Sequence, residues 1–85
     1  RSVALEMARR GLRVNALCPS FIDTPMVSQI AEVHPQMDER TRSASPMKRL
    51  GTPAEVATAA LWLCSDEASF VNGTTLAVDG GLTAM

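Results

Sequence analysis

The 85 residues contain no tyrosine, one tryptophan, one histidine and two cysteines. The histidine, His34, has no second histidine at a metal-ligand spacing, so the sequence gives no basis for a metal site. Cys18 and Cys64 lie far apart, each among apolar residues. We therefore expect two buried free thiols in a reducing, cytoplasmic environment rather than a disulfide or a metal pair.

Neither sign of charge is in excess, because 8 Lys and Arg face 9 Asp and Glu, for a net charge of −1. This balance gives no electrostatic support for binding nucleic acid or an anionic membrane surface. The charge-free run at residues 56–65 is far shorter than the roughly 20 apolar residues of a membrane span. The amino end has no pattern of a secretory signal or transit peptide. We expect a cytoplasmic protein with no nucleic-acid and no membrane partner.

The rest of the chain is organised around residues 13–26. Residues 13–18 form a short apolar run typical of a strand, which Pro19 should end because proline has no N–H for a ladder. Asp23 or Thr24 can then cap a new helix, with Pro25 in its first position. Ligands of open α/β sheets bind outside the carboxyl ends of the strands, so the loop at residues 19–24 is the candidate binding segment.

Helices are expected on both sides of this strand. Residues 1–10 have apolar positions at helical spacing and Gly11 as a stop signal, with Arg9, Arg10 and Arg13 at a solvated helix end. After the loop, residues 26–33 suit a short amphipathic helix that Pro35 breaks, and residues 37–41 suit a second short, exposed helix. This weakly apolar insert is either a lid over a site or a surface excursion without a role. Its methionines suit either an adaptable pocket or simple gap-filling.

The clearest helix start in the sequence is Thr52-Pro53-Ala54-Glu55. Threonine can cap, proline suits the first position, and glutamate three residues after the cap completes a capping box, with helix to about Cys64. A helix without charge over residues 56–65 needs cover on more than one side. Trp62 is either an anchor in a partner-subunit surface or a core residue within the chain.

Residues 75–78 suit a second strand, which Asp79-Gly80-Gly81 ends with residues that tolerate positive φ. Two strands joined through a helix form a βαβ unit, whose strands are parallel. Parallel strands are stable in wider sheets covered on both faces, and this sequence offers no further strands. We therefore expect an α/β fold, in the order helix, strand, helical insert, helix, strand, that is incomplete alone. The start at Arg1 with no strong cap suggests a preceding part.

Three stretches of the chain resemble the end of the short-chain dehydrogenases/reductases. They are residues 11–26 (with Pro19-Ser20-Phe21-Ile22-Asp23-Thr24-Pro25-Met26), residues 49–57 (Arg49-Leu50-Gly51-Thr52-Pro53-Ala54-Glu55-Val56-Ala57) and residues 65–81. The resemblance implies that residues 1–85 are the C-terminal segment of a single Rossmann-like domain with a parallel sheet. It also implies NAD or NADP as cofactor and a substrate lid at residues 25–46.

The resemblance places cofactor contacts on Pro19, Ser20, Ile22 and Thr24. In the family this loop lies against the nicotinamide, so the Ile22 backbone would contact the carboxamide. The Thr24 hydroxyl would reach the carboxamide or the adjacent phosphate. The family usually has glycine where this chain has Ser20, so either a positive φ strains Ser20 or its backbone is ordinary. Asn15 is expected to be structural.

The family's catalytic groups do not appear in this chain. Its serine, its Tyr-x-x-x-Lys pair and its glycine-rich nucleotide loop are missing, so these 85 residues cannot run hydride chemistry alone and contain no catalytic residue. The expected function is one segment of an oxidoreductase that interconverts an alcohol and a carbonyl of a small molecule, as a homodimer or homotetramer. The alternatives are a non-catalytic truncated interaction module and a helix-turn-helix regulator, and the neutral charge argues against the regulator.

Overall fold

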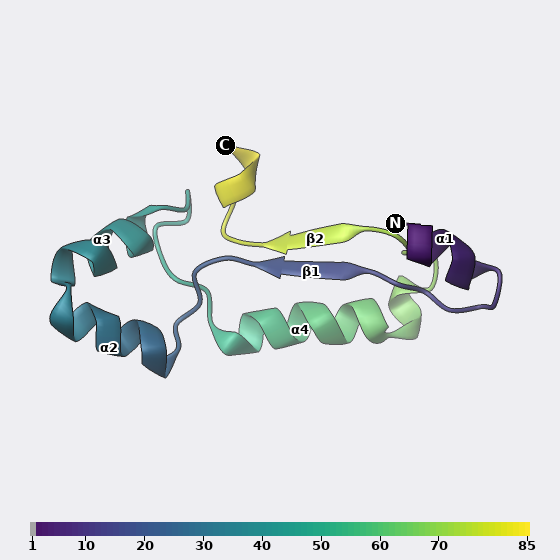
Figure 1. Ribbon diagram of the computed structural model, residues 1–85, viewed down its shortest axis with the longest axis horizontal. Coiled ribbons are helices and arrows are strands. Elements are labelled where there is room, and N and C mark those ends of the chain that lie inside the picture. The colour runs from purple at the N-terminus through teal and green to yellow at the C-terminus, as the bar shows by residue number, and fades with distance from the viewer. Residues whose placement is uncertain (1) are drawn as a thin grey trace.

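The computed structural model describes residues 2–85 as two short strands with helices at their ends and along one side (Figure 1). The elements follow the predicted order of helix, strand, helical insert, helix, strand. They are α1 (Ser2–Ala8), β1 (Ala16–Pro19), α2 (Pro25–Val33), α3 (Pro35–Ser43), α4 (Pro53–Cys64), the 3₁₀ turn η1 (Asp66–Ala68), β2 (Thr75–Val78) and the 3₁₀ turn η2 (Leu82–Ala84).

The two strands pair in parallel, as predicted, with Ala16 opposite Thr75 and Pro19 opposite Val78. The strand ends at Pro19, as predicted, although Pro19 is itself its last residue and the strand begins at Ala16 and not at residue 13. In this register Ser20 N–H donates to the Val78 carbonyl at 3.3 Å, so the nitrogen of Pro19 points to the other edge of β1. Proline costs no ladder bond at that edge, since β2 is the only strand paired with β1 within residues 2–85.

Helix α4 runs beside both strands and is held to them at its C-terminal end (Figure 1). The Arg13 guanidinium donates to the carbonyls of Leu63, Ser65 and Val71 at 2.8, 3.2 and 3.2 Å. The expectation of a solvated Arg13 was therefore wrong. A fork of N–H donors fits the unpaired carbonyls at a helix end, and its positive charge suits the negative end of the helix dipole.

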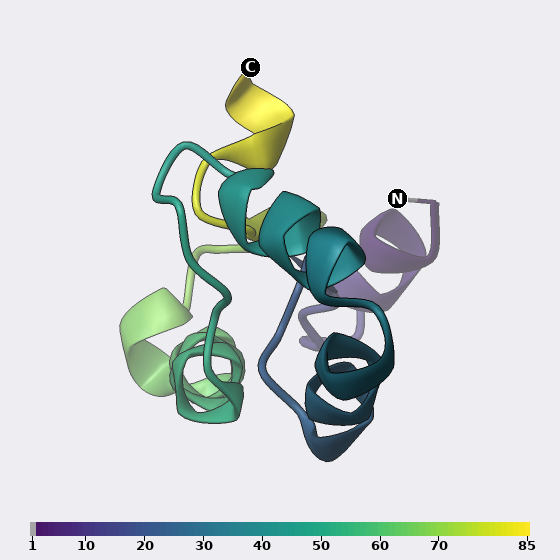
Figure 2. The ribbon, with the colours of Figure 1, turned by 90° about the vertical axis from the view of Figure 1, so that its left-hand side faces the viewer.

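The insert forms two helices that lie together at the carboxyl ends of the strands (Figure 2). Thr24 caps α2 by accepting from the Val27 N–H at 3.4 Å, and Pro25 takes the first helical position, as predicted. The predicted second helix at residues 37–41 is longer, because Pro35 begins α3 instead of only breaking α2. Proline is favourable at that position, where no N–H bond is required.

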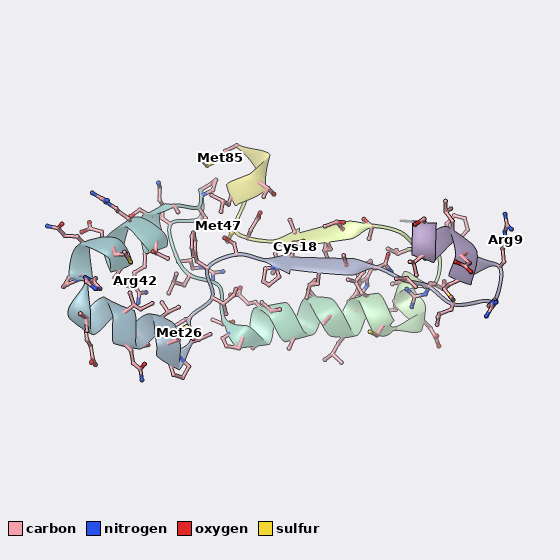
Figure 3. All side chains as sticks on the ribbon, in the orientation of Figure 1. Arg9, Cys18, Met26, Arg42, Met47 and Met85 are labelled. Carbon is pink, nitrogen blue, oxygen red and sulfur yellow. The ribbon has the colours of Figure 1, made fainter. Side chains whose placement is uncertain are left out.

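The described chain is elongated and leaves much of its apolar surface exposed. Its radius of gyration is 15.9 Å, whereas a compact domain of this length has about 12 Å. It exposes 6396 Å², against about 4900 Å² for a compact protein of this mass. The expectation of buried thiols was wrong, since Cys18 and Cys64 are both exposed. Cys18 lies on β1 in Figure 3, opposite Ala77, and both residues are exposed on a sheet with only two strands.

Candidate functional site

A cleft of about 320 Å³ lies where both strands end, at the edge of the sheet at which α/β proteins bind ligands. It is formed by the loop after β1, the segment between α3 and α4, the first turn of α4 and the turn after β2 (Figure 1). Its lining residues are Ser20, Phe21, Thr41, Ser45, Met47, Arg49, Gly51, Glu55, Ala77, Val78, Asp79, Gly80 and Gly81.

Of the four predicted cofactor residues, only Ser20 lines this cleft. Pro19 is exposed at the end of β1, and Ile22 and Thr24 lie further along the same loop, half-buried. Lys48 is the only residue other than glycine with positive φ within residues 2–85. The Ser20 backbone is therefore ordinary, and the strain considered for a serine at this position does not arise.

The loop after β1 continues the sheet by one isolated parallel bridge between Ile22 and Gly51. Gly51 N–H donates to the Phe21 carbonyl at 3.0 Å, and Asp23 N–H donates to the Gly51 carbonyl at 2.8 Å. In this pattern the N–H and C=O of Ile22 point away from Gly51, and neither makes a backbone hydrogen bond to the described residues. One donor and one acceptor therefore lie together on the side of the loop opposite Gly51.

The Thr24 hydroxyl is two residues further along. Its oxygen accepts the Val27 N–H as the cap of α2, and this leaves the hydroxyl proton available to donate. The Thr24 hydroxyl and the N–H and C=O of Ile22 thus provide two donors and one acceptor within three residues, beside the carboxyl end of β1.

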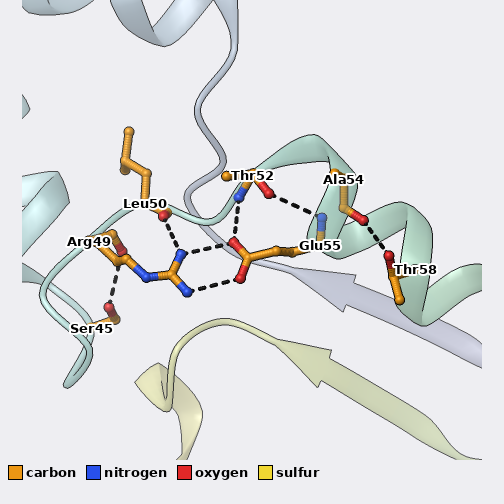
Figure 4. Close-up of polar contacts among 7 residues, drawn as sticks. All are labelled: Ser45, Arg49, Leu50, Thr52, Ala54, Glu55 and Thr58. Carbon is orange, nitrogen blue, oxygen red and sulfur yellow. Dashed lines mark hydrogen bonds and ion pairs between the residues drawn. The ribbon is translucent and has the colours of Figure 1, made fainter.

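Arg49 and Glu55 form a bidentate ion pair at one side of the cleft (Figure 4). Arg49 Nη1 and Nη2 lie 2.8 and 2.9 Å from Glu55 Oε1 and Oε2, and Nη1 also donates to the Leu50 carbonyl at 3.0 Å. Glu55 Oε1 accepts the Thr52 N–H at 2.9 Å and Thr52 Oγ1 accepts the Glu55 N–H at 3.1 Å, so the predicted capping box is confirmed. The hydrogen bond from Arg49 is the main cause that lowers the pKa of Glu55 to about 2, and the Glu55 carboxylate raises the pKa of Arg49.

Asp79 shapes the turn after β2, on the facing side of the cleft. Its carboxylate accepts from the Gly81 N–H at 3.0 Å and from the Thr83 N–H and hydroxyl at 3.1 and 2.8 Å. These hydrogen bonds, led by the one from the Thr83 hydroxyl, lower the pKa of Asp79. Gly80 and Gly81 both have positive φ, at 63° and 94°, as the sequence predicted for this turn.

Asn15 lies just before β1, at the other end of the strand from the cleft, and holds the start of β2. Its Nδ2 donates to the Val71 carbonyl at 3.0 Å, and its Oδ1 accepts the Thr74 N–H at 3.0 Å. These bonds fit the structural role expected for it. Within residues 2–85 no three His, Cys, Asp or Glu side chains gather in a group that could hold a metal ion. None of the helices there combines the length and the apolar character that a membrane crossing needs.

Sequence reasoning missed Arg49 and the turn at residues 79–81 as parts of the cleft. A signal for Arg49 was available, because an arginine close before a capping-box glutamate can pair with that carboxylate. For the turn there was none, since its approach to the segment after α3 joins residues more than 30 positions apart.

Comparison with known proteins gives consistent matches over nearly the whole chain. Residues 1–83 match the family described as enoyl-(acyl carrier protein) reductase. The chain is 42% identical over 83 residues to the short-chain dehydrogenase RED2 of Pyricularia oryzae, covering 98% of this chain and 30% of the relative. It is 48% identical over 83 residues to the galactitol 2-dehydrogenase (L-tagatose-forming) of Cereibacter sphaeroides, covering 98% of this chain and 32% of the relative.

Among solved structures, ElxO with NADP bound superposes with a TM-score of 0.89 at 28% identity, over 99% of this chain and 34% of that one. The chain thus spans about a third of the length of the proteins it matches.

Proposed function

Because the chain belongs to the short-chain dehydrogenase/reductase family, we propose that it is the C-terminal segment of an NAD(P)-dependent oxidoreductase that interconverts an alcohol and a carbonyl. The activity is that of a whole protein, of which the chain spans about a third of the length of its relatives. With no tyrosine in the sequence, the acid and base of the reaction lie elsewhere in that protein.

The chain contributes the loop that holds the nicotinamide. The observation that carries the proposal is the free N–H and C=O of Ile22 beside the Thr24 hydroxyl, at the carboxyl end of β1. A carboxamide has one carbonyl and one NH₂ group, so this set of donors and acceptor is complementary to it. When bound, NAD or NADP supplies or accepts the hydride. Pro19 and Ser20 set the direction in which the loop leaves the sheet, and Ile22 and Thr24 fix the orientation of the ring.

Residues 25–46 act as the substrate lid. Helices α2 and α3 lie at the end of the sheet where the strands stop (Figure 2), and they expose Met26, Val33 and Met37. Figure 3 shows Met26 at the start of α2 and Met47 where the insert returns to the sheet. Apolar, flexible side chains at this position suit an adaptable cover for a small alcohol or ketone.

The exposed apolar surface is the reason to place these residues inside a larger fold. A two-stranded parallel sheet is marginal alone, and the excess of exposed surface over a compact protein is about 1500 Å². Further strands beside β1 would cover Cys18, and Trp62 on α4, which is 42% exposed, would face another subunit. The homodimer or homotetramer and the cytoplasmic location stay predictions.

The test uses the full-length protein that carries this chain. Binding of NADH and NADPH is measured by calorimetry, and turnover of a panel of small alcohols, aldehydes and ketones by the absorbance of the reduced cofactor. We expect one cofactor to bind and at least one alcohol and carbonyl pair to be interconverted. A folded protein that binds neither cofactor and turns over no member of the panel would refute the proposal.

The exposure of Leu61 (72%) and Phe70 (102%) also favours a second candidate, a non-catalytic interaction module made of the chain alone. Sizing the purified 85-residue chain separates the two. A folded dimer without cofactor affinity would favour the module, whereas an aggregated or unfolded chain would favour a segment that needs the rest of its domain.

A further inference from the structure

The lid returns to the sheet through a short segment that rests on the turn after β2. We call residues 45–47 the insert root. Met47 N–H donates to the Gly80 carbonyl at 3.3 Å, and Ser45, which is only 7% exposed, lies directly against Gly80. Pro46 lies against Gly81 in the same way. The root and the turn are more than 30 positions apart in the sequence, and residues of both line the cleft.

Both glycines of the turn are required by space as well as by backbone conformation. A Cβ on Gly80 would lie 2.9 Å from Ser45 Oγ and 3.2 Å from Ser45 Cβ. A Cβ on Gly81 would lie 3.2 Å from Pro46 Cγ. Gly11 has the same left-handed conformation, with φ of 77°, but nothing lies within 4 Å of the position of its Cβ. Alanine therefore has the same conformational cost at Gly11 as at Gly80 and Gly81. Only at Gly80 and Gly81 does its Cβ also meet the insert root.

The turn is itself held in shape from within, because Asp79 accepts three hydrogen bonds from Gly81 and Thr83. The root is also closed on itself, since Lys48 N–H donates to the Ser45 carbonyl at 2.9 Å and Ser45 Oγ donates to the Arg49 carbonyl at 3.4 Å. Two small, internally bonded turns therefore meet face to face. A shift of the turn at residues 79–81 therefore moves the insert root, and the cleft wall moves with it.

We propose that the turn at residues 79–81 is the seat of the lid, and that Gly80 and Gly81 are positioning residues that set substrate affinity through the insert root. The effect on substrate affinity rests on the proposed function. The attachment of the insert root to the turn does not. Ile22 and Thr24, the proposed nicotinamide contacts, do not line the cleft with this turn, so we expect the seat to act on the substrate side.

The experiment compares Gly80→Ala and Gly81→Ala in the full-length protein, with Gly11→Ala as the matched control. The attachment is read by the rate of trypsin cleavage after Lys48 and Arg49, identified by mass spectrometry of the fragments. Cleavage follows the population in which the root has left its seat, and we expect it to rise about ten-fold in Gly80→Ala and Gly81→Ala but not in Gly11→Ala. Ser45→Ala removes the Oγ nearest to Gly80 and leaves its own Cβ at 3.2 Å, so it should partly slow cleavage in Gly80→Ala and not in Gly81→Ala.

The substrate half is read by kinetics on the best substrate of the alcohol and carbonyl panel. We expect KM to rise about ten-fold in both seat variants, with cofactor affinity unchanged, and Ser45→Ala to lower it again in Gly80→Ala alone. Wild-type cleavage rates in both seat variants, an equal rise in Gly11→Ala, or an unchanged KM with faster cleavage would each overturn the inference. A wild-type protein without turnover would refute the proposed function and the substrate half, and the cleavage rates would still decide whether the turn holds the lid.

Discussion

Replacing Arg13 by methionine should destabilise the full-length protein more than any other single surface change in this chain. Within the part of the chain that the structure describes, the guanidinium is the only side chain that joins the start of β1 to the carbonyls of Leu63 and Ser65. It also shares the Val71 carbonyl with Asn15 Nδ2. Methionine keeps most of the apolar stem but has no donor. The Leu63 and Ser65 carbonyls would then have to bond to water, and the Val71 carbonyl would keep only its bond from Asn15.

The expected loss follows from the three bonds. A hydrogen bond to a charged group contributes about 1.5–3 kcal/mol. The site is only half-buried, so water replaces part of each bond and the contributions do not add fully. We expect a loss of about 2–4 kcal/mol in the free energy of unfolding, of which the attraction between the cation and the helix end is about 0.3–1 kcal/mol.

The assay is urea unfolding of the wild type and variants, followed by circular dichroism, with the change read from the shift in midpoint at constant slope. Arg13→Lys keeps the charge, but its three donors sit on one nitrogen and cannot span carbonyls that the guanidinium reaches with two, so it should recover only about a third of the loss. Arg9→Met is the control, because Arg9 lies exposed at the far end of the molecule from the cleft (Figure 3) and should change stability by less than about 0.5 kcal/mol. An Arg13→Met variant as stable as Arg9→Met would refute the reasoning.

Three further changes test the loop and the capping box. The pKa of Glu55 is lowered from its ordinary 4.5 to about 2, so its contribution to stability is fully present above about pH 4.5 and is lost as the pH falls through 2. The stability difference between wild type and Glu55→Gln, read from urea midpoints, should therefore shrink over that pH range, and a constant difference would contradict this. Thr24→Asp keeps the cap of α2 but removes the hydroxyl donor, so cofactor affinity measured by calorimetry should fall about ten-fold or more. Thr24→Ser keeps the donor and should stay within about two-fold of the wild type. Full affinity in Thr24→Asp would show that Thr24 only caps the helix. Ser20→Gly should lower the free energy of unfolding by about 0.5–1 kcal/mol, because the Ser20 backbone is ordinary and glycine only adds freedom to the unfolded chain. A gain in the free energy of unfolding would show instead that the loop is strained at Ser20.

Local rules predicted the features that depend on neighbouring residues. The capping box of Thr52 and Glu55, the cap at Thr24 and the glycine turn after β2 each involve residues at most three positions apart, and the structure confirms all three. The parallel pairing was also predictable, because a strand, helix, strand order with a long crossover leaves few topologies.

Features that depend on distant residues were beyond the sequence patterns. The bonds of Arg13 span at least 50 positions, so a charged residue at a helix end looked solvated. The exposure of Cys18 depends on whether further strands cover the sheet, which composition does not reveal. The resemblance to a family supplied the cofactor loop, yet the direction of the free Ile22 amide followed only from its bridge to Gly51.

That bridge also has a consequence for how the family could diversify. Phe21 and Asp23 both bond to Gly51, so the chain leaves the sheet and returns to it at one pair of backbone hydrogen bonds. These bonds join the two ends of the segment at residues 24–50, whatever its sequence. Doubling the length of such a segment adds only about 0.6 kcal/mol of closure entropy. Replacing the residues between Thr24 and Leu50 by a different helical hairpin should thus change which substrates bind. The cofactor contacts of Ile22 and Thr24 should stay in place.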